Sequence, residues 1–172
     1  MRTTERLVLR PFRESDLEPW AVLNADPEVT RYLGAALTRE ESERVAAAVN
    51  AAYERNGYGF LAVERRADGV FVGAAGLSRE EFYPDDLEIG WRLAREYWGH
   101  GYATEAAASW LDYAFREAGL PRVIAVTDTP NVRSIAVMRR LGMRFDHEAV
   151  LTADGVPFDA TIYSLKAEEW RR

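Results

Sequence analysis

Residues 87–104 read LEIGWRLAREYWGHGYAT. They are the first part of the segment 87–141, which decides the fold. Apolar residues alternate over residues 87–93, which predicts a strand. Two glycines, Gly99 and Gly101, then predict a tight turn, because glycine adopts positive φ without strain. The turn leads into a helix over about 103–118, whose apolar residues recur every 3.6 positions. Backbone N–H groups at such a helix start, together with the helix macrodipole, suit a diphosphate. The alternative is that these glycines only turn the chain from strand to helix.

The remaining segments supply a frame for this turn. Serine or threonine followed three residues later by glutamate predicts capping boxes at Ser15 and Thr38. Asp68 and Asp154, each followed by glycine, predict hairpin turns. We expect the following elements: strands over residues 7–10, 59–65, 70–77, 87–93, 123–127, 144–150 and 158–165, and helices over 15–24, 26–33, 38–56, 103–118 and 131–141. Hairpins followed by a crossover helix predict one α/β (α+β) domain over residues 1–172, with a mixed sheet of about seven strands and helices on both faces.

Composition narrows the possible functions. The chain of 172 residues has a net charge of −6 and no cysteine. The lack of cysteine excludes a thiol nucleophile, a disulfide framework and a cysteine zinc site, and a chain of this length builds a core without a metal. An acidic chain is a poor binder of nucleic acid and favours a cationic or amine substrate, although the charge is also explained by solubility alone. No apolar run approaches the ~18 residues of a membrane span, so we expect a cytoplasmic protein without a membrane partner.

Five segments have a recognisable pattern in this order and spacing: residues 5–11 (ERLVLRP), 88–91 (EIGW), 97–106 (YWGHGYATEA), 131–134 (NVRS) and 140–143 (RLGM). With these segments the chain resembles the GNAT acetyltransferase superfamily, and within it the ribosomal-protein acetyltransferases that modify an N-terminal alanine or serine. The resemblance covers nearly the whole chain. One position departs from the pattern: Glu96 stands where the superfamily usually has glutamine or arginine, and we expect its side chain to point away from the phosphate.

The resemblance implies acetyl-coenzyme A as the donor, bound in a splayed sheet without a metal. The strand before the glycine turn separates from the strand after the helix, and the pantetheine arm lies in the gap. Backbone N–H groups of the first strand would polarise the thioester carbonyl, as in an oxyanion hole. The residues expected to bind the coenzyme are Ile89, Trp91, Leu93, Trp98, Gly99, His100, Gly101, Tyr102, Ala103, Thr104, Asn131 and Ser134.

The resemblance also implies N-acetyl transfer, in which the amine attacks the thioester directly in a ternary complex. Glu88 is the first candidate for the base that accepts the proton of the amine, acting through a water molecule. Its alternative is an exposed glutamate at a strand edge, and its rivals are Glu80, Glu81 and Asp85.

Ser134 is the candidate acid for the leaving thiolate, while Asn131 would hold the pantetheine amides. The alternative is that both residues only cap a helix. His100 contacts phosphate or only solvent, and His147 is expected to be a strand residue rather than a catalyst. The aromatic residues that could form a wall of the acceptor pocket are Phe82, Tyr83, Trp91 and Tyr97.

Two other functions compete with acetyl transfer. One is a GNAT-like module that senses an acyl-coenzyme A without turnover. The other is a dinucleotide-binding fold, which Thr104 disfavours because it replaces the third glycine of that fingerprint. The acceptor is expected to be a peptide N-terminus or a small amine, and the protein a monomer or a homodimer.

Overall fold

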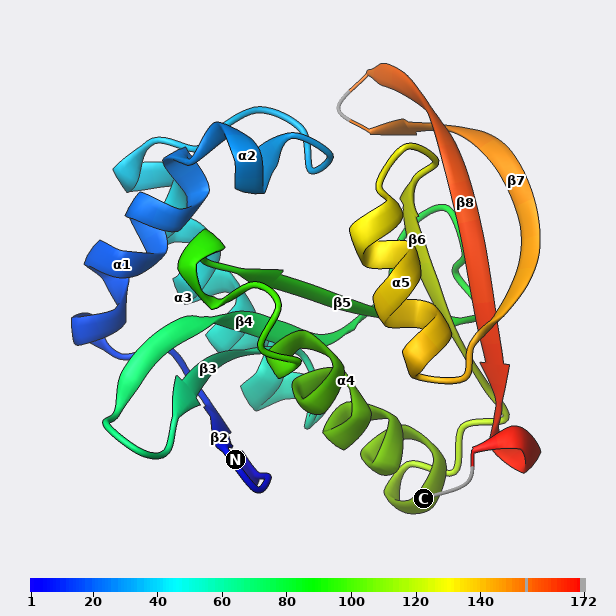
Figure 1. Cartoon of the computed structure of the whole chain (residues 1–172), viewed down its shortest axis with the longest axis horizontal. Helices are drawn as coiled ribbons and strands as arrows, with labels where there is room; N and C mark the ends of the chain where they lie inside the picture. The colour runs from blue at the N-terminus through cyan, green and yellow to red at the C-terminus, as the bar shows by residue number, and fades with distance from the viewer. Residues whose placement is uncertain (154, 171–172) are drawn as a thin grey trace.

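The computed structural model, which describes residues 1–153 and 155–170, contains one eight-stranded sheet in the order β1-β2-β3-β4-β5-β6-β8-β7 (Figure 1). The strands are β1 (Arg2–Thr3), β2 (Leu7–Arg10), β3 (Phe60–Arg65), β4 (Val70–Ser78), β5 (Leu87–Leu93), β6 (Arg122–Asp128), β7 (Arg144–Ala153) and β8 (Val156–Lys166). The predicted mixed α/β fold is confirmed. The strand beyond the expected seven is β1, which pairs with the edge of β2.

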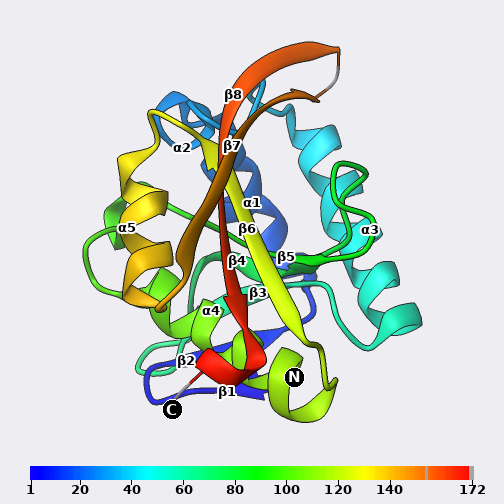
Figure 2. The same ribbon diagram turned by 90° about the vertical axis from the view of Figure 1, so that its right-hand side faces the viewer.

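The main helices are α1 (Glu14–Ala25), α2 (Pro27–Thr30), α3 (Arg39–Asn56), α4 (Tyr102–Asp112) and α5 (Val132–Arg140). One buried cluster joins α4 and α5 to one face of the sheet, and a second joins α1, α2 and α3 to the other face. Figure 2 shows α5 and α3 on opposite sides of the strands. None of the helices in the described residues is long and apolar enough to cross a membrane.

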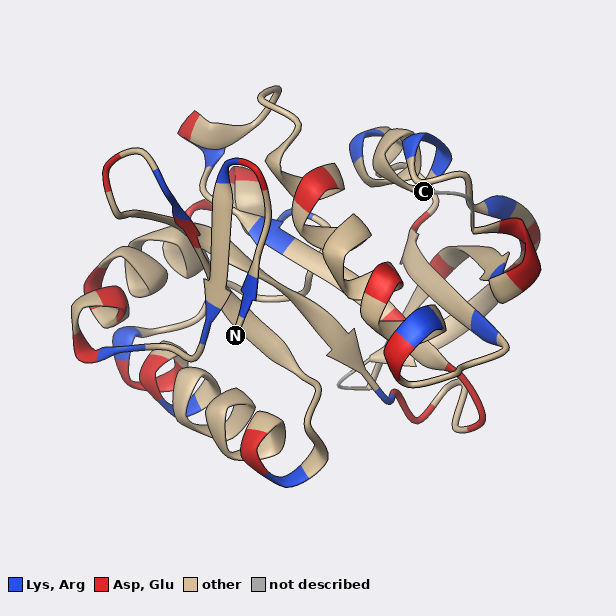
Figure 3. Ribbon diagram, turned by 90° about the horizontal axis from the view of Figure 1, so that it is seen from below, with Lys and Arg blue, Asp and Glu red and all other residues tan. Residues whose placement is uncertain are grey.

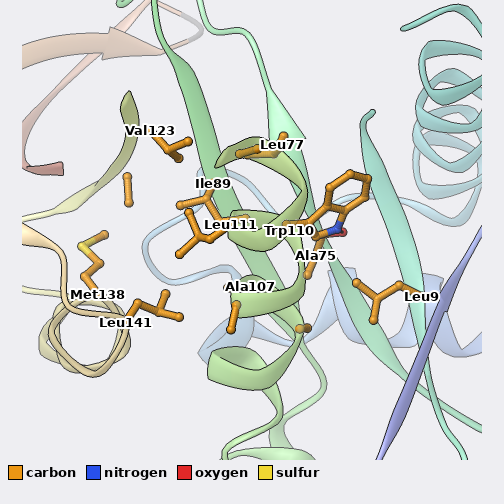
Figure 4. Packing of buried hydrophobic residues seen from close by; sticks show 14 of the residues in the cluster. Leu9, Ala75, Leu77, Ile89, Ala107, Trp110, Leu111, Val123, Met138 and Leu141 are labelled. Atoms are coloured by element: carbon orange, nitrogen blue, oxygen red, sulfur yellow. The ribbon is translucent and has the colours of Figure 1, made fainter. Parts of the chain in front are cut away.

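Helix α4 lies at the centre of the larger cluster (Figure 4). The expected 3.6 period is confirmed, because Ala107, Trp110 and Leu111 are fully buried. The indole of Trp110 donates a hydrogen bond of 3.1 Å to the backbone oxygen of Ala75 on β4. The last turn of the predicted helix is wound as a π-helix over Tyr113–Glu117. Helix α4 is thereby fixed to the sheet, and its start is fixed relative to β5.

Strands β5 and β6 separate after a short parallel contact. Their only paired residues are Leu87 with Val123 and Glu88 with Ile124. The other edge of β5 pairs with β4 along its length, and the other edge of β6 pairs with β8. The inner edge of β5 beyond Glu88 therefore has no partner strand, which confirms the expected splay. Among the described strands this pair alone is parallel, which is incompatible with the doubly wound sheet of a dinucleotide-binding fold.

Capping boxes were expected at the starts of α1 and α3, and the structure contains one of the two. The box at Thr38 is confirmed: its hydroxyl accepts from the N–H of Glu41, and its own N–H donates to the Glu41 carboxylate. The box at Ser15 is wrong, because α1 begins one residue earlier and the carboxylate of Asp16 accepts from the N–H of Arg13 at 2.8 Å. Asp16 takes this role because a buried arginine also holds it in place.

The expected helix over residues 26–33 is also shorter in the structure, where α2 ends at Thr30. The strands of the last hairpin are longer than expected and pair up to Ala153 and Val156. Asp154, which was expected in this turn, lies outside the described residues.

A buried ionic network fastens α1 to the sheet. The guanidinium of Arg10, on β2, donates to Asp16 at 2.5 and 2.9 Å and to Glu64 on β3 at 2.8 Å. Arg10 is 3% exposed and Asp16 is 2% exposed. The hydrogen bond from Asp16 is the main cause that raises the pKa of Arg10, and burial opposes it. The network therefore stays charged and sets where α1 and α2 lie over the sheet.

Replacing Asp16 with alanine leaves the Arg10 charge buried beside a single remaining carboxylate. We expect Asp16→Ala to lower the free energy of unfolding by about 3 kcal/mol, measured by urea denaturation. Glu14→Ala in the same helix turn is the control and should change stability by less than about 0.5 kcal/mol, because Glu14 is exposed. Equal effects of the two substitutions would contradict the role of the network.

Candidate active site

The glycine turn ends at the start of α4. Gly99 and Gly101 both have φ of +80°, the left-handed conformation that glycine tolerates best. Helix α4 begins at Tyr102, and no side chain caps its first turn. The N–H groups of this turn are thus available to an anion, and the helix macrodipole favours negative charge there.

A side chain from the start of the protein holds the turn in place. Arg6 donates from Nη1 to the backbone oxygen of His100 at 3.0 Å, and its guanidinium lies 4.8 Å from the centre of the Tyr102 ring. Arg6 also pairs with Glu105 at 2.6 Å, and the same carboxylate accepts from the hydroxyl of Thr4 at 2.6 Å. Burial raises the pKa of Glu105, but the hydrogen bonds from Thr4 and Arg6 outweigh it and lower the pKa overall. These contacts tie the turn to the residues that precede β2.

A cleft of about 750 Å³ runs from this turn along the open edge of β5 to α5 and α2. It is lined by ten of the residues that were expected to bind the coenzyme: Trp91, Leu93, Trp98, Gly99, Gly101, Tyr102, Ala103, Thr104, Asn131 and Ser134. Two expected residues lie elsewhere. The side chain of Ile89 is buried in the core, so that only its backbone belongs to the open edge, and His100 is exposed and stacks on Tyr102 at 5.6 Å.

The cleft is basic although the chain is acidic. Its lining contains four arginines and a single acidic residue, Glu28; Arg31, Arg133 and Arg140 come from the helical side, whereas Arg92, on the same face of β5 as Glu88, donates to Asn24 on α1 at 2.7 Å. Elsewhere acidic and basic residues alternate along the helices and loops of the ribbon (Figure 3). A positive cleft on a protein of net charge −6 concentrates an anionic ligand at this place.

The sequence interpretation missed these arginines. Arg133 and Arg140 are seven residues apart and so lie on one face of α5, together with Val137. The guanidinium of Arg133 lies 4.6 Å from the centre of the Trp98 ring, which ties α5 to the glycine turn. The helical period could have found them, but it does not say which face of α5 meets the cleft.

Asn131 and Ser134 interact with each other at the start of α5. The side-chain oxygen of Asn131 accepts from the N–H of Ser134 at 3.3 Å, so Asn131 does cap the helix. The amide nitrogen of Asn131 donates to the Ser134 hydroxyl at 3.1 Å and to Thr127 at 2.9 Å. The Ser134 oxygen therefore accepts from Asn131, and its own hydrogen is left to point towards the cleft that it lines.

Glu88 lies where β5 and β6 part, on the face of β5 opposite to Trp91 and Leu93. Burial, reinforced by the charge of Glu80, raises the pKa of Glu88 to about 8, although a hydrogen bond from the Val126 backbone opposes the rise. The alternative of a fully exposed glutamate is therefore wrong. A carboxyl group with a pKa near neutral pH can accept a proton from an amine.

The other acidic and aromatic candidates are more dispersed. Glu81 and Asp85 are exposed on the loop before β5. Glu96 lines a second cavity, beside Arg10 and Arg13, rather than the cleft of the glycine turn.

The four aromatic residues do not form one wall. Trp91 and Tyr97 line the cleft. Phe82 instead packs against Phe158, and Tyr83 is hydrogen-bonded to His147.

Comparison with known proteins agrees with this geometry. Residues 6–144 match the family model described as the acetyltransferase (GNAT) domain. The chain belongs to the GNAT acetyltransferase family. Its curated relatives include the uncharacterised N-acetyltransferase YnaD of Bacillus subtilis, 31% identical over 98% of both chains. Another is the FsC-acetyl coenzyme A-N(2)-transacetylase of Aspergillus fumigatus, 33% identical over 98% of this chain and 77% of the relative. This GNAT protein is accordingly an acetyl-coenzyme A-dependent N-acetyltransferase.

Solved structures share the GNAT fold. A GNAT acetyltransferase from Bacillus anthracis has a TM-score of 0.85 and 28% identity, and the match covers 97% of this chain and 98% of that one. RimL, an acetyltransferase of the ribosomal protein L7/L12 solved with coenzyme A, has a TM-score of 0.79 over 96% of both chains. RimL is a member of the branch that the sequence resembles, but at 17% identity the likeness is one of fold alone.

The glycine turn of this acetyltransferase offers a matched pair of substitutions. At both Gly99 and Gly119, φ is positive and an added Cβ meets no atom within 4 Å. Either substitution by alanine should therefore cost a similar free energy of unfolding, about 1 kcal/mol.

We expect Gly99→Ala to weaken binding of coenzyme A about tenfold or more, because it disturbs N–H groups that face the cleft, as measured by calorimetry. Gly119→Ala should leave the dissociation constant unchanged. Unchanged binding in Gly99→Ala would show that the turn does not hold the coenzyme.

Proposed function

We propose that this acetyltransferase transfers the acetyl group of acetyl-coenzyme A to a primary amine, either a peptide N-terminus or a small amine, by direct attack in a ternary complex in the cytoplasm. The observation that carries the proposal is the position of Glu88. It lies at the parting of β5 and β6, on the face opposite to the residues Trp91 and Leu93 of the cleft. The donor thus approaches from one face and the acceptor from the other, and both reach the open edge of β5.

The cleft fits the donor in shape and in charge. The N–H groups of residues 99–104 suit a diphosphate, and arginines such as Arg133 and Arg140 match additional negative charge. The unpaired edge of Ile89–Leu93 offers backbone groups to the amides of the pantetheine arm. An N–H of the same edge would stabilise the oxyanion that develops on the thioester carbonyl.

Glu88 accepts the proton that the amine loses. Its pKa of about 8 is close to the ~8 of a peptide α-amino group, so the proton moves between groups of similar basicity. A lysine side chain, with a pKa of ~10.4, would hold its proton more tightly. This match favours an α-amino group or another amine of moderate basicity as the acceptor.

Ser134 supports the leaving group. The nitrogen–carbon bond forms, the carbon–sulfur bond breaks, and the electron pair of that bond goes to the sulfur atom. A thiolate with a pKa of ~8.5 needs only modest help, and a hydrogen bond from the Ser134 hydroxyl supplies it. Asn131 keeps that hydroxyl oriented, since it donates to the Ser134 oxygen.

The proposal is tested by mixing the pure protein with acetyl-coenzyme A and an acceptor panel: peptides that begin with alanine or serine, a polyamine and an amino sugar. We expect release of free thiol together with an acetylated amine of the expected mass. We also expect no acetylated protein when the acceptor is omitted. The absence of thiol release with every acceptor, or an acetyl-enzyme intermediate, would contradict the proposal.

Glu88→Gln removes the proposed base with little change in shape. We expect kcat to fall about 100-fold, and the wild-type rise in kcat through pH 8 to disappear, because only the ionised carboxylate accepts a proton. The rise in kcat of the wild type should occur near pH 8 with each of two acceptors whose amines differ in pKa. A midpoint that does not follow the amine belongs to a group of the enzyme. Glu81→Gln, an exposed glutamate on the loop before β5, is the control and should keep the wild-type profile.

The same variant should be more stable than the wild type at pH 8. The pKa of Glu88 rises from about 4.5 in the unfolded chain to about 8 in the folded protein, so folding increasingly opposes ionisation between these values. The gain in melting temperature from Glu88→Gln should therefore grow from pH 5 to pH 8. A constant difference would show that Glu88 ionises freely in the folded protein.

Ser134→Ala should lower kcat about tenfold and leave the dissociation constant of acetyl-coenzyme A within about twofold, because the hydroxyl acts on the leaving sulfur. Ser134→Thr keeps the hydroxyl and should retain most of the rate. If alanine and threonine variants turn over like the wild type, Ser134 only belongs to the capping arrangement.

A further inference from the structure

Three titratable side chains on the acceptor side of the sheet form a hydrogen-bonded row that acetyl transfer as described above does not use. The hydroxyl of Tyr83, on the loop before β5, lies 2.8 Å from Nε2 of His147 on β7. Nδ1 of the same ring lies 2.8 Å from the carboxylate of Asp146. The loop and β7 are 64 residues apart in sequence, so the fold alone brings these groups together.

The chemistry of the three groups sets the direction of their hydrogen bonds. A carboxylate only accepts, so Nδ1 of His147 carries the hydrogen that points to Asp146. In the neutral ring Nε2 then accepts, and the Tyr83 hydroxyl donates to it. Asp146 is held from its other side by the Ser164 hydroxyl at 3.0 Å. The bond to His147 is the main cause that lowers the pKa of Asp146, which keeps this carboxylate charged.

The inner end of the row lies on the face of the sheet that also carries Glu88. Tyr83 packs against the apolar cluster that contains Ile124 and Val126. Ile124 is the residue that pairs with Glu88 across the parting of the strands, and the Val126 backbone is hydrogen-bonded to Glu88. The charge of Glu88 reaches Tyr83, since it contributes to raising the pKa of the phenol.

The outer end of the row lies at the surface. The side chain of His147 is 43% exposed and that of Asp146 is 29% exposed. The row therefore leads from the neighbourhood of a half-buried carboxyl group to solvent through one phenol and one imidazole.

Acetyl transfer creates a need for such a connection. Each turnover converts an ammonium ion into a neutral amide and leaves one proton in excess, which reaches Glu88 if Glu88 is the base. Glu88 is half-buried, and both burial and the charge of Glu80 raise its pKa, so it must release that proton before the next amine binds. Burial and the charge of Asp146 raise the pKa of Tyr83, so the phenol does not ionise but can pass a proton through.

We propose that Tyr83, His147 and Asp146 form a proton relay that carries the proton of the acceptor amine from Glu88 to solvent. The proposal rests on the role of Glu88 as the base. The phenol oxygen of Tyr83 accepts a proton from Glu88, directly or through one water molecule, while its own proton passes to Nε2 of His147. The resulting imidazolium is stabilised by Asp146 and gives its proton to water or buffer. Only O–H and N–H bonds change, and the relay returns to its starting state.

The charged groups around the row would stabilise an imidazolium at His147 that forms and then loses its proton. Asp146 faces the ring from β7 and Glu80 adds negative charge near the inner end. The opposing positive charge comes from Arg122 on β6, which lies 3.7 Å from Asp146 and 3.5 Å from Asp86. Arg122 is shared between two carboxylates, and at Tyr83 it lowers the pKa by less than Asp146 raises it.

The first experiment measures turnover of His147→Ala at low buffer concentration. We expect kcat to fall about tenfold or more while KM for acetyl-coenzyme A stays unchanged, and added imidazole to restore kcat in a saturable manner. Glu148→Ala, at the next and exposed position of β7, is the matched control and should need no rescue. Full kcat in His147→Ala, or a loss that imidazole does not restore, would overturn the relay. If the wild type itself transfers no acetyl group, the proposed function fails first.

The second experiment needs no turnover. The chain has two histidines, so the imidazole protons of His147 and His100 are readily distinguished by NMR during a pH titration. We expect Glu88→Gln and Tyr83→Phe each to shift the titration of His147, and to leave that of His100 unchanged, because coupled sites titrate together. Identical His147 curves in the wild type and in both variants would show that the row is not connected to Glu88.

Discussion

The separation of β5 from β6 after two residue pairs is the constraint on which the site depends. Strand β4 pairs with the outer edge of β5, and β8 pairs with the outer edge of β6, so the opening lies between their two inner edges. Backbone groups of Ile89–Leu93 are left facing an opening rather than a neighbour, which a buried sheet does not tolerate without water or a ligand. Helix α4 packs on β5 and β4 with Trp110 and Leu111 fully buried, and this packing holds the glycine turn at its start beside the open edge of β5.

The opening separates two kinds of chemistry. On the side of α4 and α5, arginines and the glycine turn make a basic cleft for an anionic donor. On the other side, the charge of Glu80 acts on Glu88 and helps to raise its pKa. Burial is the main cause that raises the pKa of Asp128, and the charge of Asp159 adds to it. This acidic side suits a cationic amine, as the negative net charge of the chain suggested. A thioester carbonyl placed in the opening would lie between the basic cleft and the acidic side.

Local patterns in the sequence predicted what lies close together in the chain. The glycine turn, the period of α4 and the capping of α5 by Asn131 each depend on neighbours within one turn. The separation of β5 from β6 was predicted from the family resemblance that residues 97–106 and 131–134 carry, because no local pattern in the sequence indicates it. Contacts across the fold were not predictable: Arg133 reaches Trp98, and Tyr83 reaches His147, only because separate elements pack together. The error at Ser15 has the same origin, since Arg10 from another element holds Asp16 at the helix start.

Hydrogen exchange of the backbone amides, measured with and without coenzyme A, tests the central claim most directly. The account predicts that the coenzyme slows exchange at two places, the open edge Ile89–Leu93 and the turn over residues 99–104. Amides of β8, which are already paired with β6 and β7, should not change. If coenzyme A binds but leaves the edge of β5 exchanging as before, the parting of the strands is not where the donor lies, and the account is contradicted.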